Sequence, residues 1–140
     1  MSYRPRPKIF IGGRTLEVEA TANVAKAAGY EVFDHIRDGN RLPELPPFDE
    51  NTAVALLYHD LDHEIPVMRE VLLGSPFYIG ALGSTRTHAN RIERLSSLGY
   101  SPSQLSRIKA PIGLFPKARD AQSLALLIVA EIAYVRQATP

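Results

Sequence analysis

Residues 77–88 read Phe77-Tyr78-Ile79-Gly80-Ala81-Leu82-Gly83-Ser84-Thr85-Arg86-Thr87-His88, and this stretch decides the fold. Its first three residues predict a buried strand, and the two glycines that follow allow a turn. From Ala89 to Leu98 apolar residues recur at every third position, which predicts a helix over 87–98 that ends before Gly99. A strand that passes through a glycine turn into a helix is the building unit of parallel α/β sheets.

The same alternation continues on both sides of this stretch. Apolar runs predict further strands at 8–11, 30–34 and 53–58, and a short extended segment at 110–114. Alanine content, apolar periodicity and capping residues predict further helices over 16–28, from Pro66 to Gly74, from Ser101 and from Asp120. We therefore expect an α/β fold that is Rossmann-like and doubly wound, with a mostly parallel sheet and helices on both faces. Residues 1–140 are expected to form a single domain.

Composition excludes several classes of function. The chain has 140 residues with 45% apolar and 22% charged side chains, as in ordinary globular proteins. Its net charge of +1 gives no general attraction to nucleic acid or to an acidic membrane. Cysteine is missing, which excludes disulfides, thiolate metal sites and cysteine nucleophiles. Because no apolar run approaches the roughly 18 residues of a membrane span, we expect a cytoplasmic protein that binds neither nucleic acid nor membrane.

The turn within 77–88 is the first candidate site. Its members are Gly80, Gly83, Ser84, Thr85 and Arg86. The glycines allow close approach of a ligand, and the first amides of the next helix, together with its dipole, favour an anion. Hydroxyls and the guanidinium of Arg86 add donors suited to phosphate. The structural alternative is that Ser84 or Thr85 only caps the helix, while Arg86, Arg91 and Arg94 are solvated.

The turn after the first strand, Gly12-Gly13-Arg14, lies where a dinucleotide-binding G-x-G-x-x-G motif would be. Arg14 occupies the position of the second glycine, and Glu17 occupies that of the third. A carboxylate at the start of the helix would repel a phosphate, so the motif is broken. Arg14 either binds an anion directly or is a surface residue.

Asp34 comes at the predicted end of the second strand, where dinucleotide-binding folds place the acid that holds a ribose hydroxyl. Arg37 follows it and could pair with Asp34 or accept a 2′-phosphate. The signal is weak because aspartate is common at strand ends, but it keeps NAD(P) among the candidate cofactors.

The segment Tyr58-His59-Asp60-Leu61-Asp62-His63-Glu64 brings two histidines and three carboxylates together after the third strand. Such groups could bind a divalent metal or transfer protons. A polar loop before a helix also carries acids for capping, and the two histidines would face one way only if the segment were helical. We expect a loop without a metal and keep His59 and Asp60 as candidate ligand contacts.

Several segments resemble one family. Residues 77–88 resemble the C-terminal domain of the XdhC/CoxI family, the xanthine dehydrogenase accessory proteins. Further similar segments, in the same order, are Tyr58-His59-Asp60 (Thr-His-Asp in the family), Ile108-Lys109-Ala110-Pro111-Ile112-Gly113-Leu114 (I-x-A-P-I-G-L), Ala118-Arg119-Asp120 and 127–132. The chain departs from the pattern at Arg14, where the family has glycine, and at Phe115-Pro116-Lys117-Ala118, where it has D-I-G-A. Full-length members carry an additional N-terminal domain.

The resemblance implies a Rossmann domain with a role in maturing molybdenum hydroxylases of the xanthine dehydrogenase type. Such factors hold the molybdenum cofactor, help its sulfuration and deliver it to the apo-enzyme. That cofactor is a pterin bearing a phosphate, sometimes extended to a dinucleotide, which would suit an anion-binding turn. The implied partners are therefore a phosphate-bearing small molecule and a molybdenum hydroxylase apo-enzyme.

The residues leave two alternatives open, a small NAD(P)-dependent oxidoreductase and an interaction module without a ligand. The broken glycine motif argues against the first, although it does not decide whether the domain has a catalytic activity of its own. A homo-oligomer is also expected, because a sheet this small leaves apolar helix faces to cover.

Overall fold

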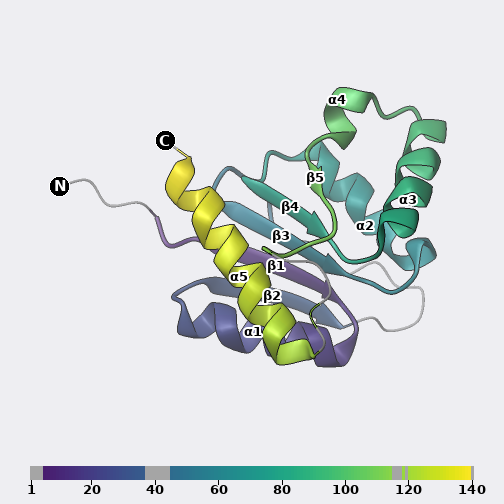
Figure 1. Ribbon diagram of the computed structural model, residues 1–140. Helices are drawn as coiled ribbons and strands as arrows, with labels where there is room; N and C mark the ends of the chain where they lie inside the picture. Colours follow the sequence, from purple (N-terminus) through teal and green to yellow (C-terminus); the bar gives the residue numbers. More distant parts are fainter. Residues whose placement is uncertain (1–4, 37–44, 115–117, 119, 140) are drawn as a thin grey trace.

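The computed structural model describes residues 5–36, 45–114, 118 and 120–139, which form alternating strands and helices around one sheet (Figure 1). In chain order the elements are β1 (Lys8–Gly13), α1 (Thr15–Ala27), β2 (Glu31–Ile36), β3 (Thr52–Leu57), α2 (Leu61–Leu73), β4 (Tyr78–Ala81), α3 (Thr85–Ser97), α4 (Pro102–Leu105), β5 (Ile108–Lys109) and α5 (Ala121–Ala138). Arg37 and residues 115–117 of the departure from the family pattern lie outside the described residues.

The sheet has five strands in the order β2-β1-β3-β4-β5, and every described pair is parallel. The chain moves outward from β1 to β2 in one direction and from β3 to β5 in the other. The strand order therefore reverses between β1 and β3, which is the place where doubly wound folds bind ligands. The predicted fold class is confirmed.

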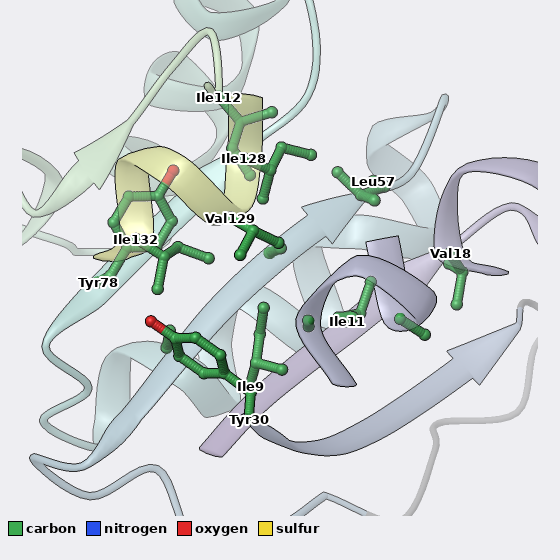
Figure 2. Close-up of a cluster of buried hydrophobic side chains, with 14 residues drawn as sticks. Ile9, Ile11, Val18, Tyr30, Leu57, Tyr78, Ile112, Ile128, Val129 and Ile132 are labelled. Carbon is green, nitrogen blue, oxygen red and sulfur yellow. The ribbon is translucent and has the colours of Figure 1, made fainter. Parts of the chain in front are cut away.

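Two layers of helices cover the sheet. Ile9, Ile11 and the odd-numbered residues of β3 face α1 and α5, and Figure 2 shows Ile128, Val129 and Ile132 of α5 pointing into this cluster. Phe10 and the even-numbered residues of β3 face the layer of α2, α3 and α4. All six residues of β3 are buried, because a central parallel strand is covered on both faces.

The second helix begins earlier than the sequence predicted. We expected Pro66 in its first turn, but α2 begins at Leu61 and contains Pro66 in its interior. The reason is Asp60, whose carboxylate accepts a hydrogen bond from the His63 amide at 2.9 Å and so caps the helix well before the proline. Proline removes one helical hydrogen bond, and its buried neighbours Ile65 and Val67 hold the helix against the sheet.

Two strands also differ from the predictions. β2 extends through Ile36, so Asp34 does not end it. A fifth strand that was not predicted lies at Ile108–Lys109, just before the predicted extended segment 110–114. The amide of Ile112 still donates to the Ala81 carbonyl at 3.1 Å, so this segment stays attached to the end of β4 after the regular pairing has ended.

A buried ion pair joins α2 to α3. The predicted solvation of Arg91 is wrong: both Arg91 and Glu64 are 0% exposed. Arg91 Nε and Nη2 donate to the two carboxylate oxygens of Glu64 at 2.5 and 2.8 Å. Arg91 Nη2 also donates to the Leu82 carbonyl at 2.8 Å, which ties the turn after β4 to both helices.

None of the helices in the described ranges combines the length and the apolar character that a bilayer span requires.

The burial of side chains on α5 predicts how much stability the protein loses when one of them is shortened to alanine. Ile128→Ala removes a side chain that is 0% exposed, so the free energy of unfolding should fall by about 2–5 kcal/mol. Leu126→Ala, on the same helix but 60% exposed, is the matched control and should change it by less than about 0.5 kcal/mol. Urea unfolding followed by circular dichroism measures both, and equal losses would contradict the packing described here.

The buried pair gives a second prediction. Glu64→Ala leaves the Arg91 guanidinium buried without its counter-ion and should lower the free energy of unfolding by about 3–5 kcal/mol. The control Asp62→Ala removes the partner of Arg94 in an ion pair whose side chains are 83% and 45% exposed, and it should cost less than about 1 kcal/mol. A Glu64→Ala loss as small as that of Asp62→Ala in the same urea assay would show that the pair does not join the helices.

Candidate functional site

Three turns that carry predicted site residues lie at the carboxyl edge of the sheet. Gly13, the last residue of β1, is in register with Leu57, the last residue of β3, so the turns that follow these two strands are neighbours. Leu56 is in register with Ala81 at the end of β4, which brings the third turn to the same edge. The sheet therefore brings Gly12, Gly13, Arg14, His59, Asp60, Gly83, Ser84, Thr85 and Arg86 together along this edge.

The turn between β4 and α3 has the geometry of a helix start that is open to an anion. Gly83 has φ +128°, and a Cβ there would lie 2.7 Å from Thr87 Cγ2, so the turn requires glycine. Ser84 caps the helix, its Oγ accepting from the Thr87 amide at 3.2 Å. The amides of Thr85 and Arg86 precede the first helical hydrogen bond and have no intrahelical acceptor. Ser84 thus caps the helix and still leaves these two amides without an intrahelical acceptor.

Arg86 and Arg14 are both exposed on this edge, and neither side chain forms a hydrogen bond or ion pair within the described part of the chain. Arg14 is the N-cap of α1 but does not cap it with its side chain. These two guanidinium groups are consequently available to a ligand, unlike Arg91 beneath them.

The space beside the glycines at this edge is filled by other parts of the same chain. A Cβ on Gly12 would lie 2.6 Å from the Tyr58 hydroxyl, and one on Gly13, at φ +143°, would lie 2.3 Å from the Leu57 carbonyl oxygen. Gly80 lies within β4, where a Cβ would meet Ile112 Cδ1 at 2.6 Å. Internal packing alone is sufficient to explain these three glycines.

The two histidines of the β3–α2 turn contact different partners. His59 Nε2 lies 3.1 Å from Glu17 Oε1 on α1, which joins the first turn to the second across the reversal in strand order. His63 Nδ1 lies 2.6 Å from Asp60 Oδ1 within its own turn. The described residues contain no group of three or more side chains arranged to hold a metal ion.

The helices that follow β1, β3 and β4 differ in the charge of their first turns. The first turn of α1 contains Glu17, and that of α2 contains Asp62 and Glu64 beside the capping Asp60. The first turn of α3 contains no acidic residue. An oxyanion at the edge would therefore meet the least repulsion at Ser84, Thr85 and Arg86.

His88, at the buried side of the same turn, is kept neutral. Burial, and then the positive charge of Arg91, lower the pKa of the His88 ring. Its Nδ1 lies 3.0 Å from Arg91 Nη1, which is the contact a neutral ring makes as an acceptor. Burial also raises the pKa of the Glu64 carboxyl, and the hydrogen bonds from Arg91 oppose that rise.

Asp34 lies apart from this turn. It is exposed on β2, in register with Ile11, and precedes the end of its strand by two residues. β2 and β4 are three strand spacings apart, or about 14 Å. Asp34 and Arg86 could therefore contact only the two ends of an extended ligand.

Sequence reasoning missed three buried polar groups near the edge. Glu64 and Arg91 fall on the buried faces of their helices, Glu64 four residues before Met68 and Arg91 four before Leu95. That periodicity could have identified them. Tyr58 is buried as well, and its hydroxyl has no hydrogen-bond partner in the described part of the chain. No signal in the sequence indicates an unpaired hydroxyl.

Comparisons with known proteins agree with this architecture. Residues 9–132 match the family model described as the XdhC Rossmann domain. The chain is 47% identical over 136 residues to the molybdenum cofactor insertion chaperone PaoD of Escherichia coli strain K12, and this match covers 97% of the chain and 42% of that protein. The chain thus spans less than half the length of this relative.

A solved structure gives the same result for the fold. A crystal structure of a xanthine dehydrogenase from Bacillus halodurans superimposes with a TM-score of 0.73, at 19% identity, over 99% of this chain and 45% of that one. At this identity the likeness shows the fold alone. The family match and the 47% identity together establish that this chain belongs to the XdhC Rossmann domain family.

Proposed function

We propose that this domain binds the phosphate-bearing part of the molybdenum cofactor and takes part in delivering it to a molybdenum hydroxylase apo-enzyme. One observation carries the proposal: of the helices that directly follow β1, β3 and β4, α3 alone has no acid in its first turn. It combines a required glycine turn with the exposed Arg86. The similarity to a molybdenum cofactor insertion chaperone supports this choice of ligand.

The residues at the edge can bind and orient a ligand. Backbone amides, hydroxyls and a guanidinium give charge-assisted hydrogen bonds to phosphate oxygens. Glu17 and Asp60 to Glu64 keep a second anionic group away from the neighbouring helix starts, so the phosphate is directed to one turn. A binding role in the cytoplasm fits these side chains. Glu17 repels the pyrophosphate of NAD(P) in its usual place, and Arg14 stands where the dinucleotide motif needs its second glycine.

Exposed apolar side chains on α5 offer a surface for a second copy of the chain or for a further domain. Leu126 is 60% exposed and Tyr134 is 70% exposed. Contact centred on Tyr134 would leave the carboxyl edge open, because Tyr134 lies in the C-terminal half of the helix, away from the strand ends (Figure 1).

Ligand-induced stabilisation tests the proposed function. Molybdopterin should raise the Tm of the chain according to RT ln(1 + [L]/Kd), which is about 2.7 kcal/mol at a hundredfold excess over Kd. Differential scanning fluorimetry with molybdopterin, cytidine diphosphate, guanosine diphosphate, NAD+ and NADP+ compares the candidates. A shift with NAD+ or NADP+ alone would favour an oxidoreductase, and no shift with any compound would favour an interaction module.

Arg86 gives the site-specific prediction. Arg86→Ala should weaken binding of molybdopterin by about 1–3 kcal/mol, because it removes a charge-assisted contact to phosphate. Lys26→Ala is the matched control: it removes one exposed positive charge from the last turn of α1, at the opposite edge of the sheet. Isothermal titration calorimetry measures both variants, and equal affinities for Arg86→Ala and the unmodified chain would remove Arg86 from the site.

A further inference from the structure

Tyr58 occupies an unusual position at the reversal in strand order. It directly follows β3 and is 5% exposed. Its side chain extends from β3 over the end of β1, where its hydroxyl takes the space that a Cβ of Gly12 would fill. The phenol therefore covers the strand end beside which ligands bind in this architecture.

The Tyr58 hydroxyl has no hydrogen-bond partner among the residues that the structure describes. It is inaccessible to solvent and makes no hydrogen bond within the described part of the chain. A buried hydroxyl without a partner gives up its hydrogen bonds to water and gains nothing in exchange. A simple filler of this space would be phenylalanine, which carries the same ring without that cost.

The hydroxyl is also kept in its donor form. Burial, and then the negative charge of Glu64, raise the pKa of Tyr58 to about 12, so the phenol keeps its proton at neutral pH. Glu64 does not act as its acceptor, since the Tyr58 hydroxyl makes no hydrogen bond to any described residue. The edge thus contains a protonated donor without an acceptor.

We propose that Tyr58 is a ligand-contacting residue of the edge site, whose hydroxyl leaves its place over Gly12 and donates to an oxygen of the bound ligand. The hydroxyl is inaccessible in the free chain, so binding requires the side chain to turn outward from the end of β3. Binding then replaces an unsatisfied hydroxyl with a charge-assisted hydrogen bond. This inference rests on the proposed function, and it adds that the Tyr58 side chain moves when the ligand binds at that site.

Tyr58→Phe tests the inference because it keeps the ring and removes only the hydroxyl. The variant should melt at a higher temperature than the unmodified chain, by roughly 3 °C or more, because it no longer buries an unpaired group. It should at the same time bind molybdopterin about tenfold more weakly, because the ligand loses one donor. Scanning fluorimetry and titration calorimetry measure the two effects separately.

Tyr78→Phe is the matched control. Tyr78 is equally buried, at 5% exposure, but its hydroxyl donates to Glu131 away from the edge. Removing that hydroxyl should lower the Tm and leave the affinity for molybdopterin unchanged.

The Tm and the affinity of Tyr58→Phe together separate failure of the inference from failure of the proposed function. A higher Tm together with weaker binding for Tyr58→Phe supports the inference. Unchanged affinity in Tyr58→Phe, with the unmodified chain binding molybdopterin, overturns the inference and leaves the proposed function in place. A lower Tm for Tyr58→Phe overturns it too, because the hydroxyl would then have a partner in the folded chain. If the unmodified chain does not bind molybdopterin, the proposed function fails, and the partner assigned to Tyr58 fails with it.

Discussion

The carboxyl edge depends on the buried pair of Glu64 and Arg91. One guanidinium holds the carboxylate of α2, the carbonyl of Leu82 and the ring of His88. The turn that presents Ser84 and Arg86 is therefore fixed to two helices from below, while its upper side is open. A buried pair of this kind contributes little net stability compared with apolar packing, but it fixes the relative position of the elements that it joins. Here those elements are the two helix starts that flank the proposed phosphate site.

Much of the fold could be predicted from local patterns. Apolar runs predicted β1, β3 and β4, and in β1 and β4 the run stops at glycine. The caps Ser101 and Asp120 were predicted, and Ser84 was one of two candidate caps, because an oxygen three residues before a free amide is a local signal. The start of α2 was missed because Pro66 was given more weight than Asp60. A proline is tolerated inside a helix whose apolar face is well packed, and no local pattern reveals that packing.

The candidate site was less predictable, because it depends on contacts between strands. Gly12 and Gly13 suggested a ligand, and their space is used by Tyr58 and by the backbone of Leu57, which belong to a strand about 45 residues further along the chain. Arg91 was expected in solvent because charged residues usually are, and only the position of Glu64 on the facing helix makes its burial possible. In contrast, Arg86 and Arg14 were placed correctly at the edge because a strand followed by a helix determines where the turn lies.

The outer strands limit how this domain can join another one. β5 has only two residues, and β2 carries Glu31, Asp34 and His35 along its length. Short or charged outer strands are poor templates for an incoming strand. The outer strands therefore disfavour enlargement of the sheet by strand addition. Assembly through helix surfaces and turns would leave the width of the sheet, and with it the spacing of the three edge turns, unchanged.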